Sequence, residues 1–166
     1  MRWPFSKDVQ PDAGPLYAAI VAEARRPHWY ATAGIEDSID GRFAVLSSLL
    51  ALADIRLGEG NEEARALSPR LTELFIADMD AQMRQQGFGD PGLGKQVRML
   101  VGALASRIDR LDGREGAEWD AAAAASLYRG EDLERAEVEL GVALLREERE
   151  RLARTPDGAF AEGKLG

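Results

Sequence analysis

Apolar residues recur at steps of three and four along most of the chain, which is the period of an amphipathic α-helix. Leu16, Ile20 and Ala24 form one such stripe, and a longer stripe runs from Leu93 to Leu111. No stretch alternates between apolar and polar residues as a half-buried β-strand would. The pattern predicts an all-α, single-domain bundle of five or six helices. We expect these helices at residues 12–26, 40–57, 68–86, 93–111, 119–128 and 132–154.

Short polar residues, prolines and glycines indicate where several of these helices begin. Asp40 is expected to be the N-cap of the second helix, because its carboxylate can accept hydrogen bonds from free backbone N–H groups. Ser68 and Pro69 are expected to open the third helix, with residues 61–67 as a lead-in turn. The glycines within residues 87–94 surround an Asp-Pro pair and predict a tight corner between two helices.

The segments outside the helices differ in character. Residues 27–39 show no sustained period, so we expect a connector there. Its Trp29, Tyr30 and Ile35 are large enough that they should cover apolar surface. The expected domain organisation is a flexible N-terminus at 1–11, a helical domain at 12–154 and a flexible C-terminal tail at 155–166.

The chain has no cysteine and a single histidine, His28. Disulfides, thiolate metal sites, a thiol nucleophile and a multi-histidine metal site within one chain are therefore excluded. His28 follows a proline and precedes two aromatic residues, where we expect a hydrogen-bonded structural role rather than a general base. No cofactor is expected.

The formal net charge of −8 argues against nucleic acid as a partner, because phosphate contacts require basic residues. Residues 91–114, in contrast, carry a local excess of positive charge, with five basic and two acidic side chains. This basic stretch predicts a weak contact with an anionic membrane surface or an acidic partner. Its basic residues are Lys95, Arg98, Arg107, Arg110 and Arg114.

The expected location follows from the absence of long apolar runs. No uncharged stretch reaches the roughly 20 residues that a membrane span requires. The opening residues, MRWPFSKDVQPD, lack the apolar core of a secretory signal. We expect a cytoplasmic protein, with the basic stretch as a candidate for peripheral contact with the inner face of a bacterial membrane.

Four aspartates provide the best case for catalysis: Asp37, Asp40, Asp78 and Asp80. Facing carboxylates in a helical bundle can hold Mg²⁺, so the alternative function is an all-α Mg²⁺-dependent hydrolase that uses these residues. Helix caps and ion pairs are the competing explanation, because residues two apart on a helix do not face each other. In that case Arg42 would pair with Asp78 or Asp80.

Several motifs, taken together, resemble the ubiquinol-cytochrome c chaperones, which assist the assembly of cytochrome b into respiratory complex III. The matching segments are LYAAIVAEARRPHWY (16–30), GIEDSIDGRF (34–43), LFIADMDAQMRQQGFGDPGLGK (74–95) and SLYRG (126–130). The resemblance implies a non-catalytic assembly factor whose partner is cytochrome b or another complex III assembly factor. The chain departs from the family in the helix after DGRF, where members tend to have a histidine and this chain reads SSLLAL (47–52).

The resemblance also implies a client-binding surface, at the 34–43 segment and the corner that begins at Gly87. The helix starts there, with Phe88 nearby, could supply apolar anchors and orienting charge. The implied client-binding residues are Tyr30, Asp37, Asp40, Gly41, Arg42, Phe43, Asp78, Asp80, Gly87, Gly89, Asp90 and Lys95.

Overall fold

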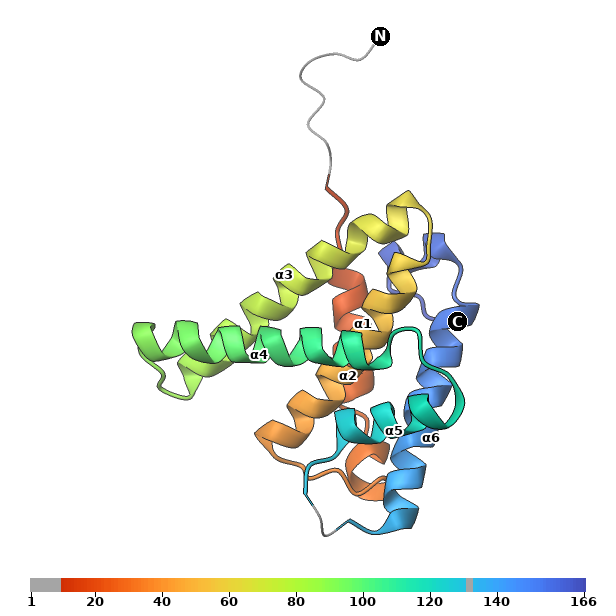
Figure 1. The fold of residues 1–166 in the computed structure, drawn as a ribbon. Coiled ribbons are helices and arrows are strands. Elements are labelled where there is room, and N and C mark those ends of the chain that lie inside the picture. The colour runs from red at the N-terminus through yellow and green to blue at the C-terminus, as the bar shows by residue number, and fades with distance from the viewer. Residues whose placement is uncertain (1–9, 131–132) are drawn as a thin grey trace, which may run out of the picture.

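The computed structural model describes residues 10–130 and 133–166, and this part of the chain contains helices and no strands (Figure 1). The prediction of an all-α, single-domain bundle is confirmed. Residues 1–9 of the expected flexible N-terminus and Asp132, the expected start of the last helix, lie outside the described residues. The elements are α1 (Gly14–Ala24), the short π-helix η1 (His28–Thr32), α2 (Ile39–Gly58), α3 (Glu62–Gln85), α4 (Asp90–Leu111), α5 (Gly116–Leu127), α6 (Arg135–Arg154) and the 3₁₀-helix η2 (Asp157–Glu162).

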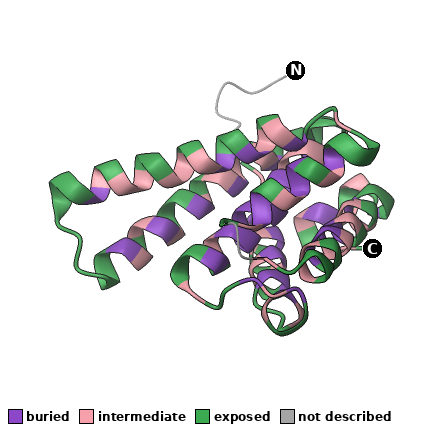
Figure 2. Ribbon diagram, turned by 60° about the horizontal axis from the view of Figure 1, so that its bottom comes forward, coloured by how far each residue is buried: buried purple, intermediate pink, exposed green. Residues whose placement is uncertain are grey.

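Helix α2 is the centre of the bundle, and the other five α-helices all pack against it. Residues 44–53 of this helix are buried without interruption. Figure 2 shows that buried residues gather on the sides of the helices that face one another. A helix that is apolar on every side needs partners on every side, which explains its central place. Its two serines tolerate burial because Ser47 donates to the carbonyl of Phe43 at 2.7 Å and Ser48 to that of Ala44 at 2.6 Å.

Two helix starts differ from the prediction. Helix α2 is capped by Ser38, whose Oγ accepts from the backbone N–H of Gly41 at 3.2 Å, so Asp40 lies in the first turn. Helix α3 begins earlier than expected, where Asn61 accepts from Ala64 N at 2.9 Å. Ser68 lies inside α3, and its hydroxyl donates to Asp54 on α2. The packing of α3 against α2 offsets the backbone hydrogen bond that the proline at position 69 cannot donate.

The C-terminal segment packs against the bundle, which differs from the flexible tail expected at 155–166. Helix η2 contacts α1 and α3, and Phe160 is fully buried. Arg56 holds the segment in place: it donates to the Thr155 carbonyl at 2.8 Å and to Asp157 at 2.7 Å, and its guanidinium lies 5.0 Å from the Phe160 ring centre. Phe160 is the aromatic anchor through which this segment packs against the bundle.

Helix α6 turns Val142, Leu145 and Leu152 into the core, whereas Leu140 is 45% exposed.

Helices α3 and α4 form a hairpin whose closed end extends away from the rest of the bundle (Figure 1). We call residues 78–100 the arm; it comprises the end of α3, the corner and the first half of α4. Gly87 has a φ of +89° at the corner, a conformation that glycine adopts without strain. Gly89 then precedes α4 as its N-cap residue. The projecting arm leaves one side of its helices facing the ends of α1 and α2.

Candidate functional site

A groove of about 1050 Å³ lies between the arm, the C-terminal end of α1, η1 and the start of α2. Its apolar lining includes Tyr30 from η1, Ile39 and Phe43 from α2, and Met79 and Phe88 from the arm. Four glutamines of the arm supply polar groups: Gln82, Gln85, Gln86 and Gln96. The groove therefore offers apolar contact area together with adaptable hydrogen-bonding groups.

Large apolar side chains in the groove remain partly open to solvent. Ile39 is 56% exposed and Phe88 is 39% exposed. Phe43 is half-buried, and its ring lies 6.2 Å from that of Phe75 in the core. Tyr30 is held by a hydrogen bond from its hydroxyl to the Ala24 carbonyl at 2.7 Å. Exposed apolar groups gathered in one concave surface are typical of a binding site for another apolar molecule.

The aspartates of the groove and arm form separate polar contacts. Asp37 pairs with Arg42 at 2.7 Å, and Asp80 pairs with Arg84 at 2.9 Å. The prediction that Arg42 pairs with Asp78 or Asp80 is therefore wrong, because Asp37, just before the N-cap of α2, lies within reach of Arg42. No group of three or more acidic or histidine residues in the described part of the chain is arranged to hold a metal ion. The hydrolase alternative lacks the converging carboxylates it requires.

The Asp78 carboxylate accepts hydrogen bonds from neutral donors. It accepts from the Tyr17 hydroxyl of α1 at 2.5 Å and from the Gln82 amide at 3.1 Å. Burial raises the pKa of Tyr17 well above its ordinary value, and the hydrogen bond to Asp78 raises it further. The phenol therefore remains a donor that ties α1 to α3 at the floor of the groove.

The structure brings half of the implied client-binding residues together. The residues that line the groove are Tyr30, Asp37, Asp40, Arg42, Phe43 and Asp78. Those outside the lining are Gly41 on α2 and, on the arm, Asp80, Gly87, Gly89, Asp90 and Lys95. Gly41 has a structural role, because a Cβ there would lie 1.8 Å from the Glu36 carbonyl oxygen. Sequence reasoning did not select Ile39 as a lining residue; an apolar side chain beside a helix cap was its only signal.

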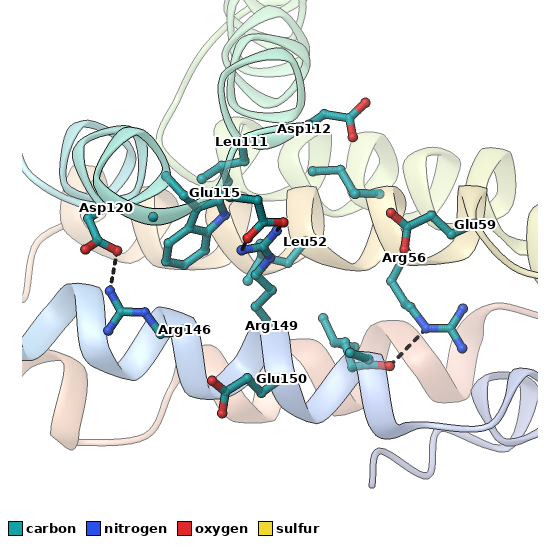
Figure 3. Close-up of a pocket in the computed structure, with 16 residues that line it drawn as sticks. Leu52, Arg56, Glu59, Leu111, Asp112, Glu115, Asp120, Arg146, Arg149 and Glu150 are labelled. Carbon is teal, nitrogen blue, oxygen red and sulfur yellow. Dashed lines mark hydrogen bonds and ion pairs between the residues drawn. The ribbon is translucent and has the colours of Figure 1, made fainter.

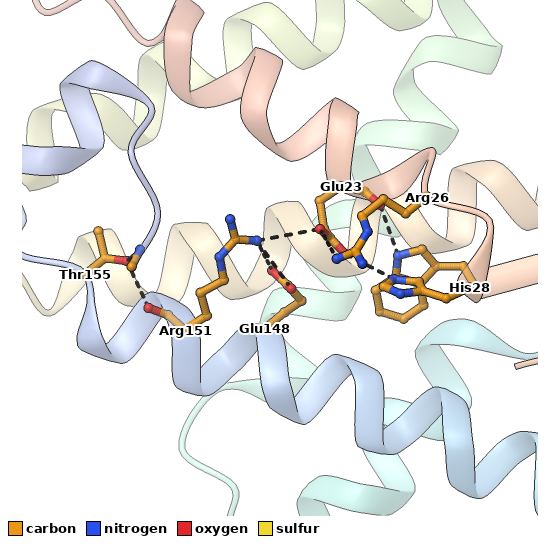
Figure 4. Close-up of polar contacts among 8 residues, drawn as sticks. Glu23, Arg26, His28, Glu148, Arg151 and Thr155 are labelled. Carbon is orange, nitrogen blue, oxygen red and sulfur yellow. Dashed lines mark hydrogen bonds and ion pairs between the residues drawn. The ribbon is translucent and has the colours of Figure 1, made fainter. Parts of the chain in front are cut away.

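A buried polar cluster fixes the ends of α1 and η1 that carry the groove residues (Figure 4). Glu23 accepts from Arg26 at 3.2 Å and from His28 Nε2 at 3.1 Å, and Arg151 of α6 lies 3.6 Å away. His28 is thus a hydrogen-bonded structural residue, as predicted. The Glu23 carbonyl also accepts from the Trp29 indole at 3.1 Å, which anchors η1 next to Tyr30.

This cluster predicts a pH-dependent stability. Burial raises the pKa of Glu148 above 4.5, and the charge of Glu23 raises it further, while Arg151 and Arg26 oppose the shift. The folded state holds this proton more tightly than the unfolded chain, so ionisation of Glu148 destabilises the fold as the pH rises above 4.5. Glu148→Gln should therefore gain stability relative to the wild type between pH 4.5 and neutrality. Urea unfolding of the wild type and the variant, at pH 4.5 and at neutral pH, tests this.

The control for that experiment is Glu147→Gln, which removes the same charge from an exposed position of the same helix. The prediction would be contradicted if the free energy of unfolding of Glu148→Gln fell relative to that of the wild type as the pH rises. That outcome would show that the ion pair with Arg151, at 3.4 Å, outweighs the desolvation of the carboxylate.

A second pocket, of about 670 Å³, lies between α2, α5 and α6 (Figure 3). Arg146 pairs with Asp120, and Arg149 pairs with Glu115 at 2.6 Å. Both guanidinium groups also lie over the Trp119 ring, 5.8 and 5.0 Å from its centre. These contacts join α5 to α6, so the arginines of this pocket are engaged in holding the bundle together.

The basic stretch at 91–114 does not form one exposed surface. Arg107 is 6% exposed, so the prediction that it contacts a membrane is wrong. Arg110 and Arg114 donate to backbone carbonyls at helix ends. Lys95 and Arg98 are exposed. Within the described residues, no helix combines the length and apolar character needed to cross a membrane.

Comparison with known proteins places the chain in a family. The ubiquinol-cytochrome C chaperone family model matches residues 31–165. The crystal structure of the Cbp3 homolog from Brucella abortus superposes with a TM-score of 0.74 at 30% sequence identity, covering 93% of this chain and 87% of that chain. No curated protein matches the chain significantly. The resemblance carried by the motifs is thus confirmed, and the chain belongs to the ubiquinol-cytochrome C chaperone family.

Proposed function

We propose that this chain is a non-catalytic assembly chaperone that holds cytochrome b in the groove during assembly of ubiquinol-cytochrome c reductase. Family membership indicates a chaperone that acts with a component or assembly partner of complex III. The observation that carries the finer proposal is the gathering of Ile39, Phe43 and Phe88 in one concave, partly open surface. Three of the four family motifs, 16–30, 34–43 and 74–95, form much of its wall.

The groove matches the chemistry of such a client. Cytochrome b is a membrane protein, so its apolar segments need cover before they are inserted. An α-helix with its side chains is about 10–12 Å wide. A few large apolar side chains in a groove can bind the apolar face of such a helix. Met79 and Met83 border the groove, and their flexible thioethers can adjust to different side chains. The arm glutamines can satisfy polar groups at the rim.

The proposal also covers place and partner. A chaperone for cytochrome b would act in the cytoplasm beside the inner face of the membrane. A membrane contact would depend on Lys95 and Arg98, the exposed members of the basic stretch. Another complex III assembly factor is the second candidate occupant of the groove, and the experiment below separates it from cytochrome b.

Phe88→Asp should weaken capture of cytochrome b roughly thirtyfold, because a carboxylate in an apolar anchor position must be desolvated. The measurement is co-purification of cell-free synthesised cytochrome b with the tagged chain. Thermal unfolding should be nearly unchanged, because Phe88 is already exposed at the corner. The matched control is Met99→Asp, which introduces the same charge at a 58% exposed position outside the lining.

Two outcomes would reject the proposal. Equal capture by the wild type and the Phe88→Asp variant would show that the groove does not hold cytochrome b. Failure of the wild type to capture cytochrome b, together with recovery of a different complex III assembly factor from the same reaction, would assign the groove to that factor instead.

A further inference from the structure

Arg107 of α4 is a buried cation without a carboxylate partner in the described part of the chain. Its guanidinium donates to the Ser126 carbonyl through Nε at 3.2 Å and Nη2 at 2.9 Å. Nη1 donates to the Ala103 carbonyl at 3.2 Å. Burial lowers the pKa of Arg107 to about 10, so the group is still charged at neutral pH. A buried charge of this kind is destabilising unless other groups compensate it.

The end of α5 provides that compensation. Ser126 lies in the last turn of α5, where carbonyl groups have no partner within the helix. These carbonyls also carry the negative end of the helix dipole, which favours a cation. Arg110 donates to the neighbouring Ala125 carbonyl at 3.5 Å. Arg107 and Arg110 thus both cap α5, and this accounts for one side of the Arg107 guanidinium.

The other side of the guanidinium faces the groove wall. Its central carbon lies 5.5 Å from the centre of the Phe43 ring, within range of a cation–π interaction. The Phe43 ring packs near Phe75 and lines the groove. Arg107 therefore connects the end of α5 to an aromatic side chain of the groove, although Arg107 is not itself part of the lining.

We propose that Arg107 is a positioning residue for client capture: it holds the Phe43 ring in the orientation that the groove presents to its client. The inference deepens the proposed function and rests on it. The planar guanidinium can donate in its plane to α5 while its face lies over the ring. A lysine has one compact ammonium and cannot do both, and methionine provides neither contact. Without the guanidinium, the ring loses the group that fixes one of its sides.

The position of the ring can be measured without a client. In protein labelled with 4-fluorophenylalanine, the Phe43 ¹⁹F resonance is assigned by its loss in Phe43→Leu. Arg107→Met should shift and broaden that resonance, and so should Arg107→Lys, which serves if the methionine variant does not fold. Arg110→Met, which removes a cap from the same helix end, should leave the resonance in place. An unshifted Phe43 resonance in the folded Arg107 variants would overturn the inference.

Capture of cell-free synthesised cytochrome b tests the functional step through a double-mutant cycle. Arg107→Met should weaken capture about tenfold in the wild-type background and have little further effect in Phe43→Leu. An equal loss in both backgrounds would mean that Arg107 acts through general stability, which overturns the inference. If Phe43→Leu alone leaves capture unchanged while the Arg107 variants still shift the ring resonance, the proposed groove is wrong and the contact between Arg107 and Phe43 stands.

Discussion

Replacing Phe160 by alanine should lower the free energy of unfolding by about 3–5 kcal/mol, the usual loss for a fully buried phenylalanine. The ring is fully buried where η2 packs against α1 and α3, and Arg56 lies over one of its faces. Its removal leaves a cavity and also loosens the segment that closes this end of the bundle. Urea unfolding followed by circular dichroism measures the loss.

The matched control is Lys164→Ala in the same C-terminal segment, because the Lys164 side chain is 77% exposed. It should change the stability by no more than about 0.5 kcal/mol. A loss below about 1 kcal/mol for Phe160→Ala would show that the segment does not contribute to the folded core, as the flexible tail expected from the sequence implies.

Replacing Gly41 by alanine should lower the free energy of unfolding by about 3 kcal/mol, near the upper end of the range for overpacking. The added Cβ would lie 1.8 Å from the backbone oxygen of Glu36 and 3.3 Å from the Ile35 side chain. Neither neighbour can move freely, because the Glu36 atom belongs to the backbone and Ile35 is buried. The segment before α2 would have to shift, and with it Asp37 and the entry to the groove. Thermal and urea unfolding test this.

Gly102→Ala is the appropriate control, because a Cβ at that position of α4 meets open space. It should stabilise the protein by about 0.5–1 kcal/mol, since alanine favours a helix interior more than glycine does. If Gly41→Ala instead keeps its stability and loses capture of cytochrome b, Gly41 contacts the client, as the family resemblance implied.

The groove itself follows from how the helices end. Helix α1 stops before the proline at position 27, and the π-helix η1 turns Tyr30 toward the start of α2. The arm then projects beyond this point because α3 and α4 are long and reverse at Gly87. A shorter α3 would bring the corner back onto the bundle and remove the outer wall that carries Phe88.

Local patterns in the sequence were enough to predict an all-α bundle of five or six helices and to indicate its family. These predictions rest on local information. The spacing of apolar residues and the motifs at 34–43 and 74–95 can be recognised without knowing which segments pack together. Leu16, Leu93 and Leu111 belong to the predicted apolar stripes and are buried in the structure. The sharp corner at Gly87 was also predicted, because its backbone conformation is one that glycine readily adopts.

The partner of each polar side chain, in contrast, depends on how distant helices pack. Ser38 rather than Asp40 caps α2, and Ser68 bonds to Asp54 instead of starting α3. Arg107 belonged to a charged stretch, yet it is buried because the end of α5 provides carbonyls that compensate its charge. Phe88 and Phe43 are distant in sequence and share one groove because the arm returns past the start of α2. Several partners can satisfy the hydrogen-bonding or packing requirements of a charged or aromatic side chain, and the packing of distant helices selects one of them.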